Sequence, residues 1–136
     1  MRICISDGAI LFETGAVRRE LGRSELLRAP IGRTAQEQLG NPEQEWRHIA
    51  IDPEPGVAVT LIYQSENLSE AMISFEVPAR AGAEWSIEIE HERRGLHDEW
   101  LRSALGDPPY EYGWGSVVSV FDEKGLGSEI IVAYAR

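Results

Sequence analysis

The sequence predicts an α+β fold, with a mainly antiparallel sheet packed by one main helix and by short N-terminal helices. Apolar residues alternate with a period of two over three stretches between residues 46 and 77, which is typical of antiparallel strands. A helical apolar stripe follows at about residues 94–105, and a hairpin pattern follows that stripe. With 136 residues, 43% hydrophobic and 26% charged, the chain has the size and composition of one globular domain, residues 1–136.

The N-terminal segment predicts a hairpin. Ile3 and Ile5 can face Ile10 and Phe12 across Asp7-Gly8. This dipeptide tolerates the backbone angles of a tight turn. We therefore expect the fold to begin with two short paired strands.

Short helices are predicted after this hairpin. The threonine that begins residues 14–20 can cap a helix, and residues 24–28 can add another turn. Thr34 and Glu37 have the spacing of a capping box, in which a hydroxyl and a carboxylate bind the first backbone N–H groups. This spacing predicts a helix that ends at Leu39-Gly40.

The central part of the chain predicts an antiparallel meander. Its three strands are expected at Trp46–Ile51, Val57–Tyr63 and Ala71–Val77. Apolar residues occupy every second position of the last two stretches. Each strand should therefore have one side for the core.

Residues 85–92 alternate in the same way, which predicts a further strand with an apolar side and an acidic side. The acidic side would carry Glu88, Glu90 and Glu92. The main helix is expected after Gly95, because its apolar residues fall at helical spacings. Gly106 is expected to close this helix, since glycine adopts the left-handed conformation at low cost.

The last part of the chain predicts a hairpin. Its strands are expected at Tyr110–Phe121 and Ser128–Ala135, with a turn over residues 122–125. The second of these strands is apolar on both faces, which is typical of a strand in the middle of a sheet.

Charge and cysteine content limit the class of protein. Thirteen Lys and Arg against twenty-three Asp and Glu give a formal net charge of −10, which repels nucleic acid and anionic membranes and attracts basic partners. Cys4 is the only cysteine, which favours a reducing compartment and excludes an internal disulfide. The first residues predict no signal peptide, and residues 130–135 are too short an apolar run to span a bilayer. We therefore expect a cytoplasmic protein that binds neither nucleic acid nor membrane.

The three histidines do not predict a catalytic or metal site. His91 and His97 are six residues apart, and on one helix this spacing turns the two rings away from each other. His48 near Asp52, with Cys4 or a serine elsewhere as nucleophile, would need a chain geometry that no motif supports. We expect no metal and no cofactor, and we assign no catalytic residue. A small hydrolase using His48 or His97 is the least favoured alternative.

Two groups of residues are candidates for binding. The acidic strand side with Glu88, Glu90 and Glu92 could meet a basic protein partner, with Tyr110 and Tyr112 nearby as aromatic anchors. The alternative is a small-ligand pocket between sheet and helix. Its aromatic lining would be Trp100, Tyr112 and Trp114.

The C-terminal third carries a pattern of aromatic, glycine and strand residues that resembles a family of small bacterial proteins. The pattern includes Trp100-Leu101, Tyr110, Trp114-Gly115-Ser116-Val117, Lys124-Gly125, Val132 and Tyr134. Some members resemble immunity proteins encoded beside secreted toxins. The resemblance implies an α+β domain without an assigned enzyme activity, one that neutralises a partner. We therefore expect a non-enzymatic interaction protein of immunity type, and nothing in the sequence predicts a homo-oligomer.

Overall fold

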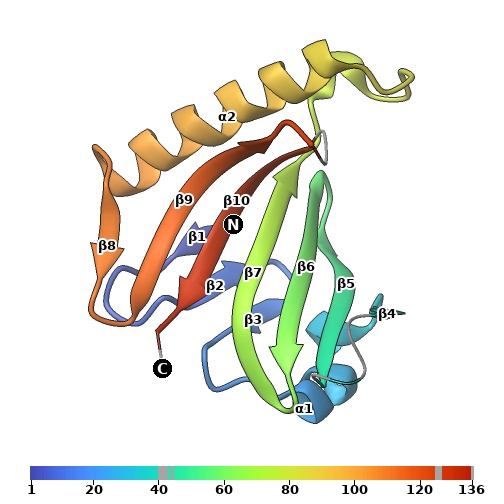
Figure 1. The fold of residues 1–136 in the computed structure, drawn as a ribbon, viewed down its shortest axis with the longest axis vertical. Helices are drawn as coiled ribbons and strands as arrows, with labels where there is room; N and C mark the ends of the chain where they lie inside the picture. Colours follow the sequence, from blue (N-terminus) through green and yellow to red (C-terminus); the bar gives the residue numbers. More distant parts are fainter. Residues whose placement is uncertain (40–42, 44, 125–126, 136) are drawn as a thin grey trace.

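The computed structural model describes residues 1–39, 43, 45–124 and 127–135, and it shows an α+β fold (Figure 1). A seven-stranded antiparallel sheet, a three-stranded sheet and one long helix make up most of it. The strands are β1 (Arg2–Ile3), β2 (Ile10–Phe12), β3 (Gly15–Val17), β4 (Gln36–Leu39), β5 (Trp46–Glu54), β6 (Val57–Gln64), β7 (Asn67–Phe75), β8 (Tyr110–Tyr112), β9 (Gly115–Asp122) and β10 (Gly127–Tyr134). The helices are α1 (Arg23–Arg28) and α2 (Ile87–Leu105), with single 3-10 turns at Pro30–Gly32 and Pro78–Arg80.

The large sheet has the strand order β4-β5-β6-β7-β10-β9-β8. Its middle strands β5, β6 and β7 form the predicted meander. Strands β5 and β6 extend beyond the predicted ends, whereas β7 begins before the predicted Ala71 and already ends at Phe75, so that Val77 lies outside it. Strand β10 lies between β7 and β9, so the prediction of a central final strand is confirmed. The two halves of the large sheet are thus joined by the last strand of the chain.

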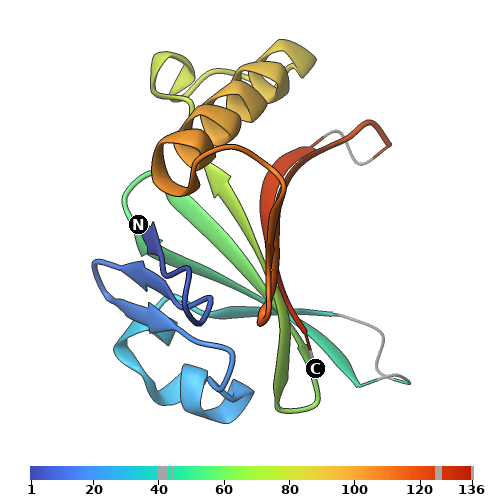
Figure 2. The same ribbon diagram turned by 90° about the vertical axis from the view of Figure 1, so that its left-hand side faces the viewer.

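One face of the large sheet is covered and the other is open. Figure 2 shows α2 and the three-stranded sheet on the same side of the large sheet, one above the other. The core lies between these layers, and its members include Ile49, Leu61, Ile73 and Ile130 from the large sheet and Leu101 from α2. In Figure 1 the strands β1–β3 lie behind β9, β10 and β7, so the viewer looks onto the open face.

The predicted N-terminal hairpin is confirmed by the pairing of Ile3 with Ile10, although Ile5 belongs to the connecting turn and is exposed. The predicted helix over residues 14–20 is wrong, because Gly15–Val17 form β3 and pair with β2. The Thr14 hydroxyl donates to the carbonyl of Pro53 at 2.7 Å instead of capping a helix. A partner distant in sequence has replaced the local one.

The predicted helix at residues 34–40 is also wrong, because Gln36–Leu39 form the edge strand β4. Both groups of the expected capping box bind elsewhere. The Thr34 hydroxyl accepts the backbone N–H of Asp52, and Glu37 forms ion pairs with Arg23 and Arg47. Gly40, the predicted last residue of that helix, lies outside the described residues.

The predicted acidic strand at residues 85–92 is wrong, because α2 already begins at Ile87. The Ser86 hydroxyl accepts the backbone N–H of Ile89, which is the hydrogen bond of a helix N-cap. Acidic residues in the first turn further favour the helix, since its N-terminus carries partial positive charge. The predicted helix at about residues 94–105 is confirmed as the larger part of α2, which ends at Leu105 with Gly106 at a positive φ of 86°.

Polar side chains of α2 complete a gap in the large sheet. Strands β7 and β10 pair as far as Ile73 and Ile130 and then separate. Beyond that point, the Phe75 N–H donates to Nε2 of His97 at 3.0 Å, and Arg93 Nε donates to the Phe75 carbonyl at 2.9 Å. Across the gap, the backbone N–H of Ser128 donates to Glu90 at 3.0 Å. The helix therefore supplies the partners that a neighbouring strand provides elsewhere in the sheet.

The first strand of the predicted C-terminal hairpin is divided in two. Tyr110–Tyr112 form β8, and β9 begins only at Gly115, which also pairs with Tyr134 of β10. A side chain at Gly115 would place its Cβ 1.9 Å from the carbonyl oxygen of Ala133. The chain therefore reverses at Gly113-Trp114. The absence of a side chain at Gly115 then allows the start of β9 to pair closely with β10.

Candidate interaction surface

Glu90 does not belong to an acidic surface, contrary to the prediction. It lies on the buried side of α2 and is 3% exposed. Its carboxylate accepts hydrogen bonds from Trp85, Arg93 and the Ser128 backbone. Burial alone would raise the pKa of Glu90, but these hydrogen bonds and the charge of Arg93 hold the pKa below its usual value. Glu90 is a structural anchor for β10.

Glu88 and Glu92 lie on the exposed side of the first turns of α2. Glu92 is bound by Arg80, which approaches to 2.8 Å, and this contact lowers the pKa of the carboxyl. The role of both residues in binding a partner stays a prediction. Their helical spacing separates them from Glu90, so the three do not form one row.

The aromatic residues near β8 serve mainly to fix the fold. Tyr110 is 7% exposed, and its hydroxyl donates to the carbonyl of Gly106, so little of its surface is accessible to a partner. Trp114 is also buried, and its indole N–H donates to the carbonyl of Ile5 at 2.7 Å. Tyr112 is half-buried and stacks on Trp114 with ring centroids 5.1 Å apart.

The predicted aromatic pocket of Trp100, Tyr112 and Trp114 is not formed as one site. Trp100 lines a cavity between α2 and the ends of β5, β6 and β7, and neither Tyr112 nor Trp114 contributes to it. Tyr112 and Trp114 are instead packed near Tyr134 of β10. Of the three predicted residues, Trp100 alone lines this cavity, and its role in binding a ligand stays a prediction.

The histidines and the cysteine lie in separate places. His97 is fully buried, whereas His48 lies half-buried on β5, paired with Gln38 and Ile62 of the neighbouring strands. Cys4 lies in the turn after β1, where its sulfur is 3.9 Å from an Arg2 nitrogen. Among the described residues, no group of three or more His, Cys, Asp and Glu side chains is placed to hold a metal ion.

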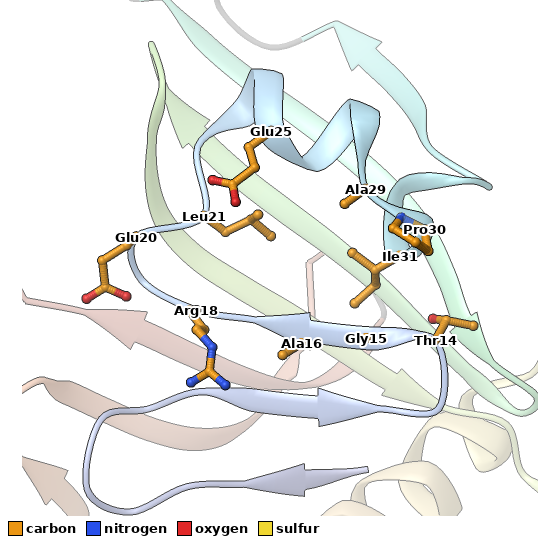
Figure 3. Close-up of a pocket in the computed structure, with 10 residues that line it drawn as sticks. All are labelled: Thr14, Gly15, Ala16, Arg18, Glu20, Leu21, Glu25, Ala29, Pro30 and Ile31. Atoms are coloured by element: carbon orange, nitrogen blue, oxygen red, sulfur yellow. The ribbon is translucent and has the colours of Figure 1, made fainter.

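A small pocket of about 310 Å³ lies between β3 and the segment of α1 and Pro30–Gly32 (Figure 3). Leu21 and Ile31 contribute apolar lining. Figure 3 shows Glu25 directed into the space below α1, while Arg18 and Glu20 are directed away from it. Polar groups that converge on a ligand are typical of a binding site, and here they diverge.

The open face of the large sheet is the most extensive candidate surface, and we call it the outer face. It is defined by the side chains that alternate with the core residues along the strands. Its members include Trp46, His48, Ala50, Ala58, Thr60, Ile62, Glu70, Met72, Ser74, Ser116, Val118, Val120, Glu129, Ile131 and Ala133.

Apolar side chains form a continuous row across the middle of the outer face. Met72 of β7 is paired with Ile131 of β10, which is paired with Val118 of β9. Val118 is 44% exposed, and Met72 and Ile131 are partly exposed. Neighbouring positions carry Ile62 and Val120. An apolar patch surrounded by polar residues is typical of a protein interaction site.

The charges on the outer face are negative. Arg47 is the only Lys or Arg within the described parts of the seven strands, and it lies on the covered side with Ile49. The outer face instead carries Glu70 and Glu129 beside the apolar row. Partial burial raises the pKa of Glu129, and the nearby carboxylates of Asp122, Glu70 and Glu90 raise it further. A cation placed here would relieve this repulsion.

The signal for the outer face was present in the sequence. Within residues 127–134, Glu129, Ile131 and Ala133 occupy the alternate positions to the buried residues Ile130 and Val132. The sequence indicated a strand apolar on both faces, but it did not show which face the other layers would cover.

In the part of the chain that the structure describes, no helix is both long enough and apolar enough to cross a bilayer. Comparisons with protein-family models, curated proteins and solved structures return no match to this chain.

Proposed function

We propose that the chain is a non-enzymatic interaction protein that binds a basic protein partner through the outer face. One observation carries this proposal. The open face of the large sheet combines a row of apolar side chains, Met72, Ile131 and Val118, with acidic residues, and no Lys or Arg of the described strand residues lies on this face. Apolar contacts would supply affinity, and the carboxylates would favour a partner whose binding surface is positively charged.

A second copy of this chain is a less suitable partner. Two outer faces packed together would bring Glu70 and Glu129 toward the same carboxylates of the other copy. The repulsion that already raises the pKa of Glu129 would then increase. The net charge of −10 also opposes self-association and accelerates the encounter with a basic protein.

The test compares three purified proteins, each of which has been shown to be folded. Glu70→Lys/Glu129→Lys alters the outer face, Glu88→Lys/Glu92→Lys alters the exposed side of α2 by the same charge, and the wild type is the reference. A protein captured from a lysate of the source organism by the wild type is purified and titrated onto each chain. Binding through the outer face weakens only for the first variant, by at least tenfold.

Two results would overturn the outer face as the binding surface. One is loss of binding by Glu88→Lys/Glu92→Lys alone, which would show that the partner binds to the exposed side of α2. The other is equal loss by both variants, which would indicate attraction by net charge alone. Replacing Val118 with Arg provides a further check, because it should weaken binding through the apolar row without removing a carboxylate.

An immunity-type role makes one additional claim, namely that binding inhibits the partner. The measurement is the activity of the captured protein with increasing amounts of wild-type chain and of Glu70→Lys/Glu129→Lys. Inhibition by the wild type that the variant lacks supports this role. Binding without any change in activity would leave an interaction protein that is not an inhibitor.

A further inference from the structure

The cavity beside Trp100 differs in character from the outer face. It has a volume of about 570 Å³, within the range of small-molecule sites. Phe75 of β7 and Trp100 of α2 are both in its lining, with ring centroids 5.6 Å apart and planes at 82°. Two nearly perpendicular rings form a corner, which is part of the arrangement that surrounds an organic cation.

The aromatic corner is held in place before any ligand arrives. His97 contacts the Phe75 ring at a centroid distance of 5.0 Å and also accepts the Phe75 backbone N–H. Arg93 donates to the carbonyl of the same residue. Three contacts from His97 and Arg93 therefore hold Phe75 in place, and little ordering of this residue would accompany binding.

The charged side chains around the cavity are all carboxylates. Glu76 directly follows Phe75 and Glu99 directly precedes Trp100, and both are exposed. Neither forms an ion pair in the described part of the chain. A third, Glu54, is already bound by the backbone N–H of Glu13 and by the Met1 amino group. Two of the three carboxylates, Glu76 and Glu99, thus leave negative charge at the rim that no cation of the described chain neutralises.

Apolar side chains also line the cavity, among them Val57, Pro78 and Leu96. A primary ammonium ion has three N–H donors that need acceptors, and neither these apolar side chains nor the two aromatic rings supply them. A quaternary ammonium group has no N–H and spreads its charge over its methyl groups, so it suits aromatic faces within an acidic rim.

We propose that this cavity binds a small quaternary ammonium compound, with the cationic group against Phe75 and Trp100 and with Glu76 and Glu99 attracting it. The proposal is independent of the outer face and of any protein partner. It commits to a free small molecule because the cavity has the volume of such a ligand.

The experiment titrates choline onto the wild-type chain and follows the indole N–H signals by NMR. The matched control is 3,3-dimethyl-1-butanol, which has the shape of choline without its charge. Choline should shift the Trp100 signal and bind at least about fivefold more tightly than the neutral compound. A peptide containing trimethyl-lysine forms a third arm, and preference for it over choline would overturn the assignment to a free small molecule.

Variants locate the site. Trp100→Leu keeps an apolar side chain and should weaken choline binding about tenfold, and Glu99→Gln should weaken it less. Glu88→Gln, which removes an exposed carboxylate elsewhere on α2, should have no effect. Circular dichroism first establishes that each variant is folded. Equal binding of choline and its neutral analogue, unchanged binding by Trp100→Leu, or no spectral change at millimolar choline would each overturn the proposal.

Discussion

The imidazole of His97 accepts the backbone N–H of Phe75, so a helix side chain completes the hydrogen bonding of a strand. His97 is fully buried, and burial together with the nearby charge of Arg93 lowers its pKa from 6.5 to about 4. The folded protein at neutral pH therefore contains His97 in its neutral form. Glu90 and Arg93, on the same side of α2, serve the same gap between β7 and β10.

The first prediction concerns pH. Above pH 6.5 the folded and unfolded chains both hold His97 neutral, and this residue adds no pH dependence. Between pH 6.5 and about 4, His97 is protonated in the unfolded chain but remains neutral in the folded chain. The free energy of unfolding therefore falls as pH falls. The loss should reach roughly 3 kcal/mol in urea unfolding. In His97→Gln, whose amide can still accept the Phe75 N–H, this part of the pH dependence should disappear.

The second prediction concerns Glu90, which is 3% exposed and bound by Arg93, Trp85 and Ser128. Glu90→Ala leaves Arg93 without its carboxylate and the Ser128 N–H without its acceptor. The free energy of unfolding should fall by about 3–5 kcal/mol. The exposed Glu88 is the matched control, and Glu88→Ala should change stability by less than about 0.5 kcal/mol. Similar small effects of both substitutions would contradict the anchoring role of Glu90.

The third prediction uses two glycines of one turn. A Cβ at Gly115 would lie 1.9 Å from the carbonyl oxygen of Ala133, whereas a Cβ at Gly113 would have no neighbour within 4 Å. Gly115→Ala must displace β9 from β10 and should cost about 3 kcal/mol or more. Gly113→Ala should be nearly neutral. Thermal unfolding of the two variants measures this difference directly.

The fourth prediction concerns Glu129 on the outer face. Its pKa is raised by partial burial and by neighbouring carboxylates, so its ionised form opposes folding at neutral pH. Glu129→Gln should therefore increase stability at pH 7 by up to about 1 kcal/mol, and the gain should vanish at a pH where the carboxyl is protonated. If the outer face binds a basic partner, the same variant should bind more weakly. Lower stability at pH 7 would contradict the proposed repulsion.

The strands of the meander could be predicted because each carries its own alternation of apolar and polar residues. Val59 and Leu61, for example, are buried at the positions that the pattern of β6 indicates. The apolar stripe of α2, which includes the buried Leu101, could be predicted for the same reason, because its spacing is visible within one segment of the sequence. Where one face of an element is buried, the sequence records which face it is.

The errors arose where a local signal and a distant partner competed. Thr14 and Thr34 are suitable helix caps, yet their hydroxyl groups bind Pro53 and Asp52 on β5. At residues 85–92 the period of two competed with the N-cap of Ser86, and the helix prevailed. This last error could have been avoided, because a capping serine followed by acidic residues is itself a helix signal.

Less of the candidate sites could be predicted than of the fold. Trp100 was correctly placed between sheet and helix, but Phe75, Glu76 and Glu99 come to it only through the packing of β7 against α2. The outer face likewise depends on which side of the sheet α2 and the small sheet cover. Such relationships arise between elements, and a single sequence does not encode them as a periodicity.

The attachment of the N-terminal layer also affects how the protein folds during translation. The indole of Trp114 binds the carbonyl of Ile5, and the hydroxyl of Tyr134 binds the carbonyl of Gly8. These bonds join residues 109 and 126 positions apart. Strands β1–β3 are therefore held in part by residues that are synthesised much later than the strands themselves. The N-terminal layer thus reaches its complete set of contacts only after β10 has been synthesised.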